Sequence, residues 1–587
     1  MNKNLIISET TKNNWEKLHV NEDEYISKLT KRANKLYSKK QFLPIEYLKD
    51  KSNLSKVKKI INYIKTTNYD IETLIYNLSL NILQKHNLIH IDKYITSKNK
   101  NLKNVLNEYK NKTICRDLID IQIPIEGDIL GFIYQSLMSE GNKNKKGSYY
   151  TPEHIINDVL NDIESNILFL DPCCGTGSFL LKAADKIKNP ENIYGCDLDE
   201  IACYISKINL IIKYKDKDFM PQIYNINFLS EKTDEIFRNK KFDVITTNPP
   251  WGAMLTQIKH EIKKSLTNIV KSKESYSYFI VQVKNLLKEN GKCRFVLPES
   301  ILNVKTHTDI RKFILDSYSI EEIKSWGQAF SGVLTNVLTI KLSNRKSSKN
   351  IKIITSEGIK YVKQTEYTKY ENNRFMLIDN SDAEIINRIF LTEHLTLKNS
   401  IWGLGIVTGD NNKHLSDNPK IGEKIYTGKN IEPYFIKDSL QYISYNREEF
   451  QQVASEDIYR AKEKLVYKFI SKKPIFAYDD KQRLFLNSAN ILIPRIETHS
   501  IKTVMAFLNS TLFIYLYKNM FNELKILKGN LEELPFPILD EKIKKELENY
   551  VEKYIKIKDN KIPEHIDTIV YKTFSLSKKD IKIIKNK

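Results

Sequence analysis

Short apolar segments alternate with helical stretches through the middle of this chain, and this alternation constrains the fold more than any other feature. Strands separated by helices predict βαβ units, and therefore an α/β, Rossmann-like fold with a mainly parallel sheet and helices on both faces. Ligands bind such sheets at the carboxyl ends of the strands. The predicted strands are residues 167–170, 193–198, 242–248, 293–298 and 337–343.

The regions on either side of these strands differ from them in periodicity and composition. Residues 1–125 show helical periodicity, many lysines and almost no glycine, which predicts an N-terminal helical region. Residues 126–375 hold the alternating strands and helices. In residues 376–587 strand-like pieces, turns, aromatic residues and basic residues mix without a repeat. We therefore expect three parts, of which the last is a mixed α/β domain.

The chain is strongly basic. Its 93 lysines and arginines exceed its 72 aspartates and glutamates, which leaves a formal net charge of +21 at pH 7. Such an excess favours a polyanionic partner, most often nucleic acid. Lysine, isoleucine and asparagine are abundant throughout, so genome composition is an alternative source of the charge.

The cysteines and apolar runs argue against other classes of protein. The six cysteines lack the paired spacing of a zinc site, and a disulfide scaffold is not expected in a chain of 587 residues. No apolar run approaches the roughly 20 residues that cross a bilayer, and the first residues are too polar for a secretory signal. We expect a cytoplasmic protein with no bound metal and no membrane association.

The first motif that indicates chemistry is FLDPCCGTGSFLL, residues 169–181. A strand ends in Asp171, and a turn with Gly175 and Gly177 leads into a helix, so the backbone can approach a ligand closely. The next strand ends near Asp197, where a carboxylate can hold ribose hydroxyls. This layout suits NAD or S-adenosylmethionine, and a purely structural turn is the alternative.

The second motif is TTNPPWG, residues 246–252, directly after a predicted strand. Two prolines remove two backbone donors and fix the chain, which leaves carbonyl acceptors beside the Asn248 amide. The Trp251 indole adds a flat apolar surface. Acceptors next to an aromatic plate suit a planar NH2 group on an aromatic ring, and a rigid loop with a packed tryptophan is the alternative.

A third segment, EGNKNKKGSYYTPEHI, lies upstream at residues 140–155. It predicts a lysine-rich loop followed by a helix, with Thr151 as the N-cap and Pro152 at the first helical position.

Taken together, GSYYTP, D-P-x-x-G-x-G-x-F and N-P-P-W resemble gamma-class S-adenosylmethionine-dependent adenine-N6 DNA methyltransferases. That class includes TaqI-type single-chain enzymes and the modification subunits of type I systems. The resemblance is strong over residues 126–345. It implies a methyltransferase domain over 126–375 and a target-recognition domain over 376–587, where WGLGIVTGDN, IYTGKNIEPY and LNSTLF resemble the family more weakly.

The resemblance also implies which residues hold S-adenosyl-L-methionine. The methionine end would contact the loop motif and Asp171, the ribose hydroxyls would contact Asp197, and the adenine would lie against Phe228. The residue before Phe228 is usually Asp but is Asn227 here, so we expect altered cofactor binding. The implied cofactor-binding residues are Tyr150, Thr151, Pro152, Asp171, Pro172, Gly175, Gly177, Phe179, Asp197, Asn227 and Phe228.

The implied catalytic residues are Asn248, Pro249, Pro250, Trp251 and Phe330. Asn248 and the Pro249 carbonyl would accept hydrogen bonds from the N6 hydrogens of an adenine flipped out of the duplex. Trp251, in place of the commoner Tyr or Phe, would stack on that base with Phe330, for which a place in the hydrophobic core is the alternative. The rate would depend on positioning and electrostatics, without a strong base.

Double-stranded DNA is the implied partner, with a separate restriction endonuclease or specificity subunit left open. We find no convincing nuclease motif in residues 1–125. Other readings are a methyltransferase of RNA adenine or of a protein glutamine amide, and a cofactor-binding recognition subunit that needs a partner. Candidate DNA contacts in the C-terminal part, each with an ordinary solvated residue as the alternative, are Lys429, Lys468, Lys472, Lys473, Tyr478, Arg483, Lys525 and Lys528.

Overall fold

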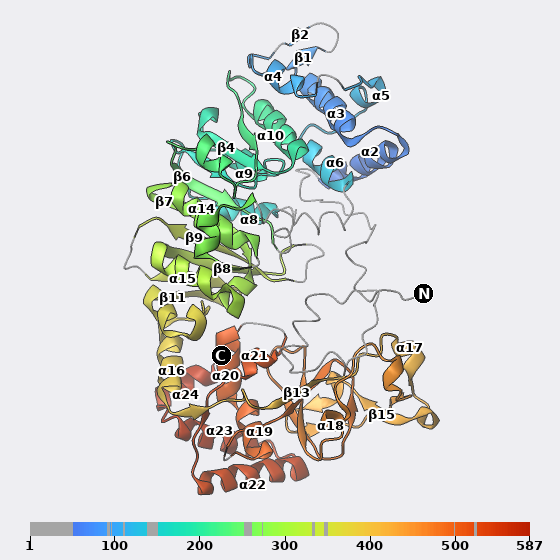
Figure 1. Cartoon of the computed structure of the whole chain (residues 1–587), viewed down its shortest axis with the longest axis vertical. Helices are drawn as coiled ribbons and strands as arrows, with labels where there is room; N and C mark the ends of the chain where they lie inside the picture. Colours follow the sequence, from blue (N-terminus) through green and yellow to red (C-terminus); the bar gives the residue numbers. More distant parts are fainter. Residues whose placement is uncertain are drawn as a thin grey trace. The chain divides into compact units, whose positions relative to one another are not determined.

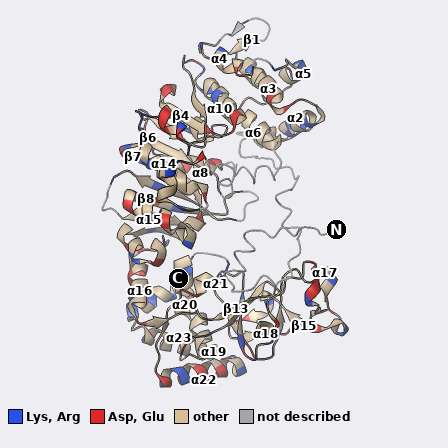
Figure 2. Cartoon of the chain, viewed as in Figure 1, with Lys and Arg blue, Asp and Glu red and all other residues tan. Residues whose placement is uncertain are grey.

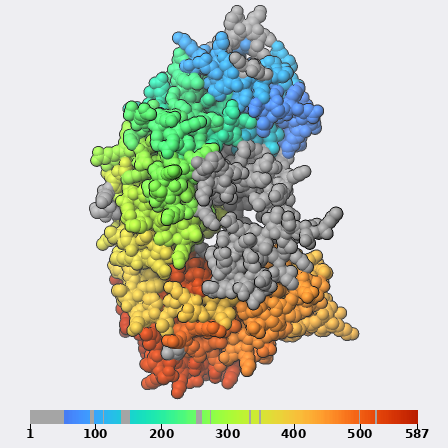
Figure 3. All heavy atoms as spheres, viewed as in Figure 1, coloured from blue at the N-terminus to red at the C-terminus, as the bar shows by residue number. Residues whose placement is uncertain are grey.

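The computed structural model divides the chain into two compact units, with the boundary between Phe375 and Met376. Figure 1 labels their elements, and Figure 3 colours them along the sequence, from blue to yellow and from yellow to red. The structure describes residues 51–90, 94–95, 97–109, 112–137, 151–251, 261–272, 274–330, 335–345, 350–497, 499–521 and 525–586.

A nine-stranded sheet is the centre of the first unit, in the order β11-β10-β8-β9-β7-β6-β3-β4-β5. Strands β7, β6, β3, β4 and β5 are parallel neighbours. The strands are β3 (Phe169–Asp171), β4 (Ile193–Asp197), β5 (Gln222–Asn225), β6 (Phe242–Thr247), β7 (Leu287–Pro298), β8 (Ser319–Gly327), β9 (Val337–Ser343), β10 (Ile351–Thr355) and β11 (Gly358–Val362).

The predicted mainly parallel sheet is confirmed, but strand β9 does not share that direction. It pairs antiparallel with both β7 and β8. A parallel pair needs a crossover of about a dozen residues or more, and only residues 328–336 separate β8 from β9. A connection that short returns the chain in the opposite direction.

Helices of the first unit fall into packed groups. Helices α9 and α10 contact strands β3 and β4, whereas α14 and α15 contact β7 and β8. The described helices are α2 (Leu54–Thr66), α3 (Ile71–Lys85), α4 (Leu102–Asn107), α5 (Arg116–Ile119), α6 (Ile129–Leu137), α8 (Glu153–Val159), α9 (Ser178–Ala183), α10 (Glu200–Lys213), α11 (Lys232–Ile236), α13 (Lys264–Ile269), α14 (Ser275–Leu286) and α15 (Thr308–Ser317). Strands β1 (Ile89–His90) and β2 (Tyr94–Ile95) form a separate pair.

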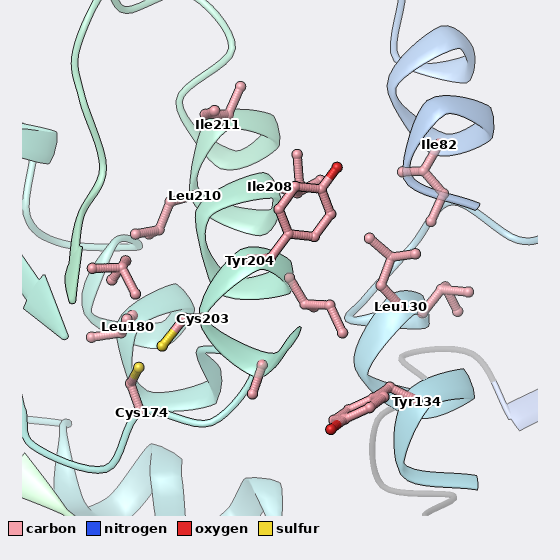
Figure 4. Close-up of a cluster of buried hydrophobic side chains, with 14 of the residues drawn as sticks. Ile82, Leu130, Tyr134, Cys174, Leu180, Cys203, Tyr204, Ile208, Leu210 and Ile211 are labelled. Carbon is pink, nitrogen blue, oxygen red and sulfur yellow. The ribbon is translucent and has the colours of Figure 1, made fainter. Parts of the chain in front are cut away.

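The described residues before the sheet share its hydrophobic core. Helices α3, α4 and α6 contact α10, and one cluster of buried side chains runs from α2 through α10 into the sheet. Figure 4 shows Leu130 and Tyr134 of α6 beside Tyr204 of α10, with the sulfur atoms of Cys174 and Cys203 directed toward each other. The N-terminal helices therefore pack directly on the element that follows strand β4.

The second unit has its own core and several small sheets. Its strands are β12 (His394–Leu395) with β23 (Phe536–Pro537); β13 (Ile401–Leu404), β22 (Ala489–Ile493), β19 (Lys464–Lys468) and β20 (Phe476–Asp479); β14 (Leu415–Ser416), β18 (Tyr442–Ile443), β15 (Glu423–Tyr426) and β21 (Leu484–Phe485); and β16 (Ile431–Glu432) with β17 (Phe435–Ile436). Its described helices are α16 (Asn380–Leu391), α17 (Asn411–His414), α18 (Glu456–Tyr459), α19 (Ile501–Asn509), α20 (Thr511–Phe521), α21 (Lys528–Leu531), α22 (Glu541–Ile557), α23 (Ile562–Thr573) and α24 (Lys578–Lys585). Across the described part of the chain, no helix is both long and apolar enough to cross a membrane.

Candidate active site at the strand ends

The glycine-containing turn after strand β3 is tied to the end of strand β4. Gly175 has φ of +52° and donates its backbone N–H to Asp197 Oδ2 at 2.8 Å. Gly177 has φ of +100°, and a Cβ there would lie 2.8 Å from Ser206 Oγ. Because both positions lie in the left-handed region, a residue with a side chain is disfavoured at each. The two glycines let this turn close over the strand ends.

Asp171, the last residue of β3, is a fully buried carboxyl group. Its Oδ1 accepts the Cys173 N–H at 3.1 Å, while Oδ2 is buried and makes no hydrogen bond with a described residue, although the Thr247 hydroxyl is close enough to lower the pKa of the carboxyl group slightly. Burial raises the pKa of Asp171 to about 7, because the charged form has lost its hydration. An orphaned buried carboxylate oxygen is costly unless a ligand satisfies it.

Asp197 and Asn227 lie at the neighbouring strand ends. The Asp197 carboxylate accepts backbone N–H groups from both Gly175 and Asp199, and its carbonyl accepts the Ile226 N–H at 3.0 Å. The Asn227 side chain is also engaged, since Oδ1 accepts the Leu229 N–H and Nδ2 donates to Glu261 at 3.0 Å. A negative charge is therefore present beside Asn227, although Asn227 itself carries none.

Phe228 lies next to Asn227 but is directed into the protein. Its ring stacks on Phe279, with centroids 5.6 Å apart and an interplanar angle of 12°. It is 2% exposed, so little of its surface is accessible. Pro172 and Phe179 are likewise buried, the latter in the hydrophobic core.

Asn248 follows strand β6, and its orientation is set by Thr151. Asn248 Nδ2 donates to Thr151 Oγ1 at 3.1 Å, across 97 residues of sequence. The prediction that Thr151 caps the next helix is wrong, because α8 begins at Glu153 and its N-cap is Pro152, without a side-chain cap. The Thr151 hydroxyl serves Asn248 instead. The predicted lysine-rich loop up to Tyr150 lies outside the described residues.

Trp251, three residues after Asn248, packs on Phe330, which is 5% exposed and belongs to the hydrophobic core of the first unit. The Trp251 and Phe330 centroids are 5.3 Å apart at an interplanar angle of 68°. Trp251 Nε1 donates to the Val296 carbonyl at 3.3 Å, which joins the loop after β6 to strand β7. The Pro250 carbonyl accepts a hydrogen bond from the Ser275 hydroxyl at the start of α14. These contacts hold the N-P-P-W segment from both sides.

One polar network near the site was not predicted. Buried Asp128 accepts hydrogen bonds from the Thr176 hydroxyl at 2.5 Å, Asn209 Nδ2 at 2.8 Å and the Gly131 N–H at 2.8 Å. Asn209 Nδ2 also donates to the Thr176 carbonyl at 2.9 Å. An Asp just before a helical pattern signals a capping residue, but its link to the glycine-containing turn exists only in the folded chain. Asp128 therefore connects helix α6 to that turn.

Comparison with known proteins gives two matches along the chain. Residues 125–386 match the N-6 DNA methylase family model, and residues 423–536 match the TaqI-like C-terminal specificity domain. The type II methyltransferase M.VspI of Vibrio sp. (strain 343) is 32% identical over 320 residues, which cover 51% of this chain and 74% of that protein.

Two further similarities cover different extents. The methylase subunit of the Escherichia coli type I restriction enzyme EcoEI is 25% identical over 261 residues, and the match spans 51% of that subunit. The structure of the type IIL restriction-modification enzyme MmeI in complex with DNA aligns with a TM-score of 0.60 over 90% of this chain and 96% of that chain. At 13% identity the latter is a likeness of fold.

Proposed function

The chain belongs to the N-6 DNA methylase family of adenine-specific DNA methyltransferases, and on that premise we propose that it transfers a methyl group from S-adenosyl-L-methionine to N6 of a flipped adenine in double-stranded DNA. One observation carries this proposal. The Asn248 amide that follows strand β6 is oriented by the Thr151 hydroxyl, and the same N-P-P-W segment carries the Trp251 indole, which packs on Phe330.

The strand ends fit the cofactor. The orphaned Asp171 Oδ2 would satisfy the α-ammonium group, and a carboxylate acceptor for a cation forms a strong hydrogen bond. Gly175 and Gly177 allow the backbone to approach, and Asp197 would accept the ribose hydroxyls. Asn227 with Glu261 supplies oxygen acceptors for an adenine amino group. When bound, the cofactor supplies an electrophilic methyl group on a sulfonium.

Asn248 and Pro249 would prepare the adenine amine. The lone pair of N6 is delocalised into the ring, so this nitrogen is a poor nucleophile. Because Asn248 Nδ2 is committed to Thr151, the amide presents its oxygen as an acceptor for one N6 hydrogen. The Pro249 carbonyl would accept the other, while the Pro250 carbonyl is held by Ser275. Two acceptors favour a tetrahedral, more nucleophilic nitrogen, and fixed dipoles need no reorganisation during reaction.

Trp251 would stack on the flipped base, and Phe330 would support the indole from behind through their edge-to-face contact. Adenine N6 is paired inside a duplex, so the nucleotide must leave the stack at a cost of a few kcal/mol. Stacking on aromatic side chains recovers about 1–3 kcal/mol per base.

The surplus proton leaves N6 after methyl transfer, because the methylated amine is briefly cationic and strongly acidic.

The second unit would read the DNA sequence, since it contains the match to a specificity domain. The similarity to a type I methylase subunit makes a restriction-modification partner part of the proposal.

Methyl transfer from labelled cofactor to unmethylated genomic DNA tests the proposal. We expect label on adenine N6 at one recurring sequence. Asn248→Ala should lower the rate at least about 100-fold, the effect of removing one preorganised polar group from an active site. Asn549→Ala, an exposed asparagine of α22, is the matched control and should leave the rate unchanged. Label on protein or RNA, or none on DNA, contradicts the proposal.

A further inference from the structure

Four loops of the second unit meet at one place and carry an unusual charge. We call them the lysine loops. They contain six lysines and no aspartate or glutamate. By contrast, helix α22 of the same unit carries lysines and glutamates along its length (Figure 2). The lysine loops are residues 427–430, 468–473, 486–489 and 525–528.

Backbone contacts join these loops. The Gly428 N–H donates to Ser488 Oγ at 2.9 Å, and the Phe469 N–H donates to the Ser488 carbonyl at 3.0 Å. The Ile526 N–H donates to the Phe469 carbonyl at 2.8 Å. A Cβ at Gly428 would lie 2.7 Å from the Ser488 carbonyl, so the first and third loops are in close contact. Segments almost 100 residues apart thus form one connected surface.

The exposed lysines of this surface lack acidic partners. Lys429, Lys472, Lys473 and Lys525 are exposed, and none forms an ion pair with a described residue. Elsewhere in the unit, Lys413, Lys424 and Lys437 pair with Glu449, Asp438 and Glu432 at 2.6–2.7 Å. Unpaired cations gathered on adjoining loops repel one another, and a bound polyanion would relieve that repulsion.

An apolar side chain lies among these lysines. Ile470 is 65% exposed, and its backbone bridges to Lys525. Lys525 Nζ lies 6.0 Å from the centroid of the Phe469 ring. Proteins that enter the minor groove of DNA often combine cationic side chains with an inserted apolar residue such as isoleucine.

Three other residues predicted to contact DNA differ from these lysines, because their side chains have partners within the protein. Arg483 pairs with Asp479 at 2.7 Å, and the Tyr478 hydroxyl donates to Glu463. Lys528 lies 3.6 Å from Glu532. These three side chains are committed within the protein.

We propose that the lysine loops are the surface through which the second unit binds duplex DNA, with Lys429, Lys472, Lys473 and Lys525 on phosphates and Ile470 in the groove between them. This rests on the proposed function, because it names the contact surface of the recognition domain.

The test compares two triple variants of the full chain that remove the same charge. One is Lys472→Ala/Lys473→Ala/Lys525→Ala, and its matched control is Lys413→Ala/Lys424→Ala/Lys437→Ala. Binding to fluorescent, unmethylated genomic fragments is measured from low to high salt. Each lost phosphate contact reduces the slope of log K against log salt by about 0.9, so the first variant should lose about 2.7 and the control almost nothing. Ile470→Ala should weaken binding without changing the slope, because an apolar contact releases no counterions.

Equal changes in both triple variants, or no change in the first, overturn the proposal. Thermal unfolding of each variant verifies that it is folded, and the cofactor affinity should be unchanged. If the slopes differ as expected but DNA is never methylated, the proposed function fails while the binding surface stands.

Discussion

The strand-end site and the lysine loops both use charged side chains, but they place them in opposite environments. Asp171 and Asp128 are buried with their carboxyl groups away from water. Lys472 and Lys473 are exposed. A buried charge is hardly screened by salt and titrates far from its ordinary pKa, whereas an exposed one is screened within about 10 Å at 0.1 M salt. We therefore expect the first region to respond to pH and the second to ionic strength.

Asp171→Asn should have the largest effect of the variants that sharpen this comparison. It keeps the shape and removes the charge, and a hydrogen bond to a charged group contributes about 1.5–3 kcal/mol. Cofactor affinity should fall about 10- to 100-fold, since about 1.4 kcal/mol corresponds to a factor of ten. Calorimetry of cofactor binding at low and high salt gives the value, which should not depend on salt.

The wild-type protein should show a matching pH dependence. With the pKa of Asp171 at about 7, binding a cationic ammonium below that pH requires release of a proton. Affinity should therefore rise with pH up to about 7 and level off above it, and Asp171→Asn should abolish this trend. A flat affinity profile in the wild-type protein contradicts the comparison.

The stability of the protein should depend on pH in the opposite direction. The folded state keeps a proton on Asp171 that the unfolded chain releases, so the contribution of Asp171 to the free energy of unfolding falls as pH rises from about 4 to 7.

Thr151→Val should have an intermediate effect and acts on catalysis. It removes the acceptor that orients the Asn248 amide, at a cost of about 1 kcal/mol for one neutral hydrogen bond. We expect single-turnover methyl transfer to slow about five- to tenfold, with the cofactor affinity nearly unchanged. Thr151→Ser keeps the hydroxyl and should retain the rate. An equal loss in both variants would show that packing of the methyl group matters instead.

Asp128→Asn should have the smallest effect of these three. The asparagine replaces one of two acceptor oxygens with a donor that faces the Thr176 hydroxyl or the Asn209 amide. Loosening of the turn should weaken cofactor binding about two- to threefold, which corresponds to about 0.5 kcal/mol, the lower end of the range for one hydrogen bond, and should lower the unfolding temperature. Asp120→Asn, at an exposed position, is the control. A loss of stability with unchanged cofactor affinity would make Asp128 a purely structural residue.

Local patterns in the sequence account for much of the strand-end site. Asp171, Gly175 and Gly177 lie within one short motif, and Asn248 to Trp251 lie within another, so each set could be read directly. The pairing of Thr151 with Asn248 could not, because it depends on where the loop before α8 lies relative to β6. The local pattern around Thr151 predicts a helix cap, but in the folded chain its hydroxyl bonds to Asn248 instead.

The sequence by itself determined the alternating strands, the order of the three motifs and the excess of lysine, because each is a property of neighbouring residues or of composition. Tertiary structure alone decided that β9 runs antiparallel, that Asp128 holds the glycine-containing turn, and which lysines are paired. Those outcomes depend on strand order and on contacts between segments far apart in the chain. In the lysine loops, backbone hydrogen bonds between such segments bring together cations that are scattered in the sequence.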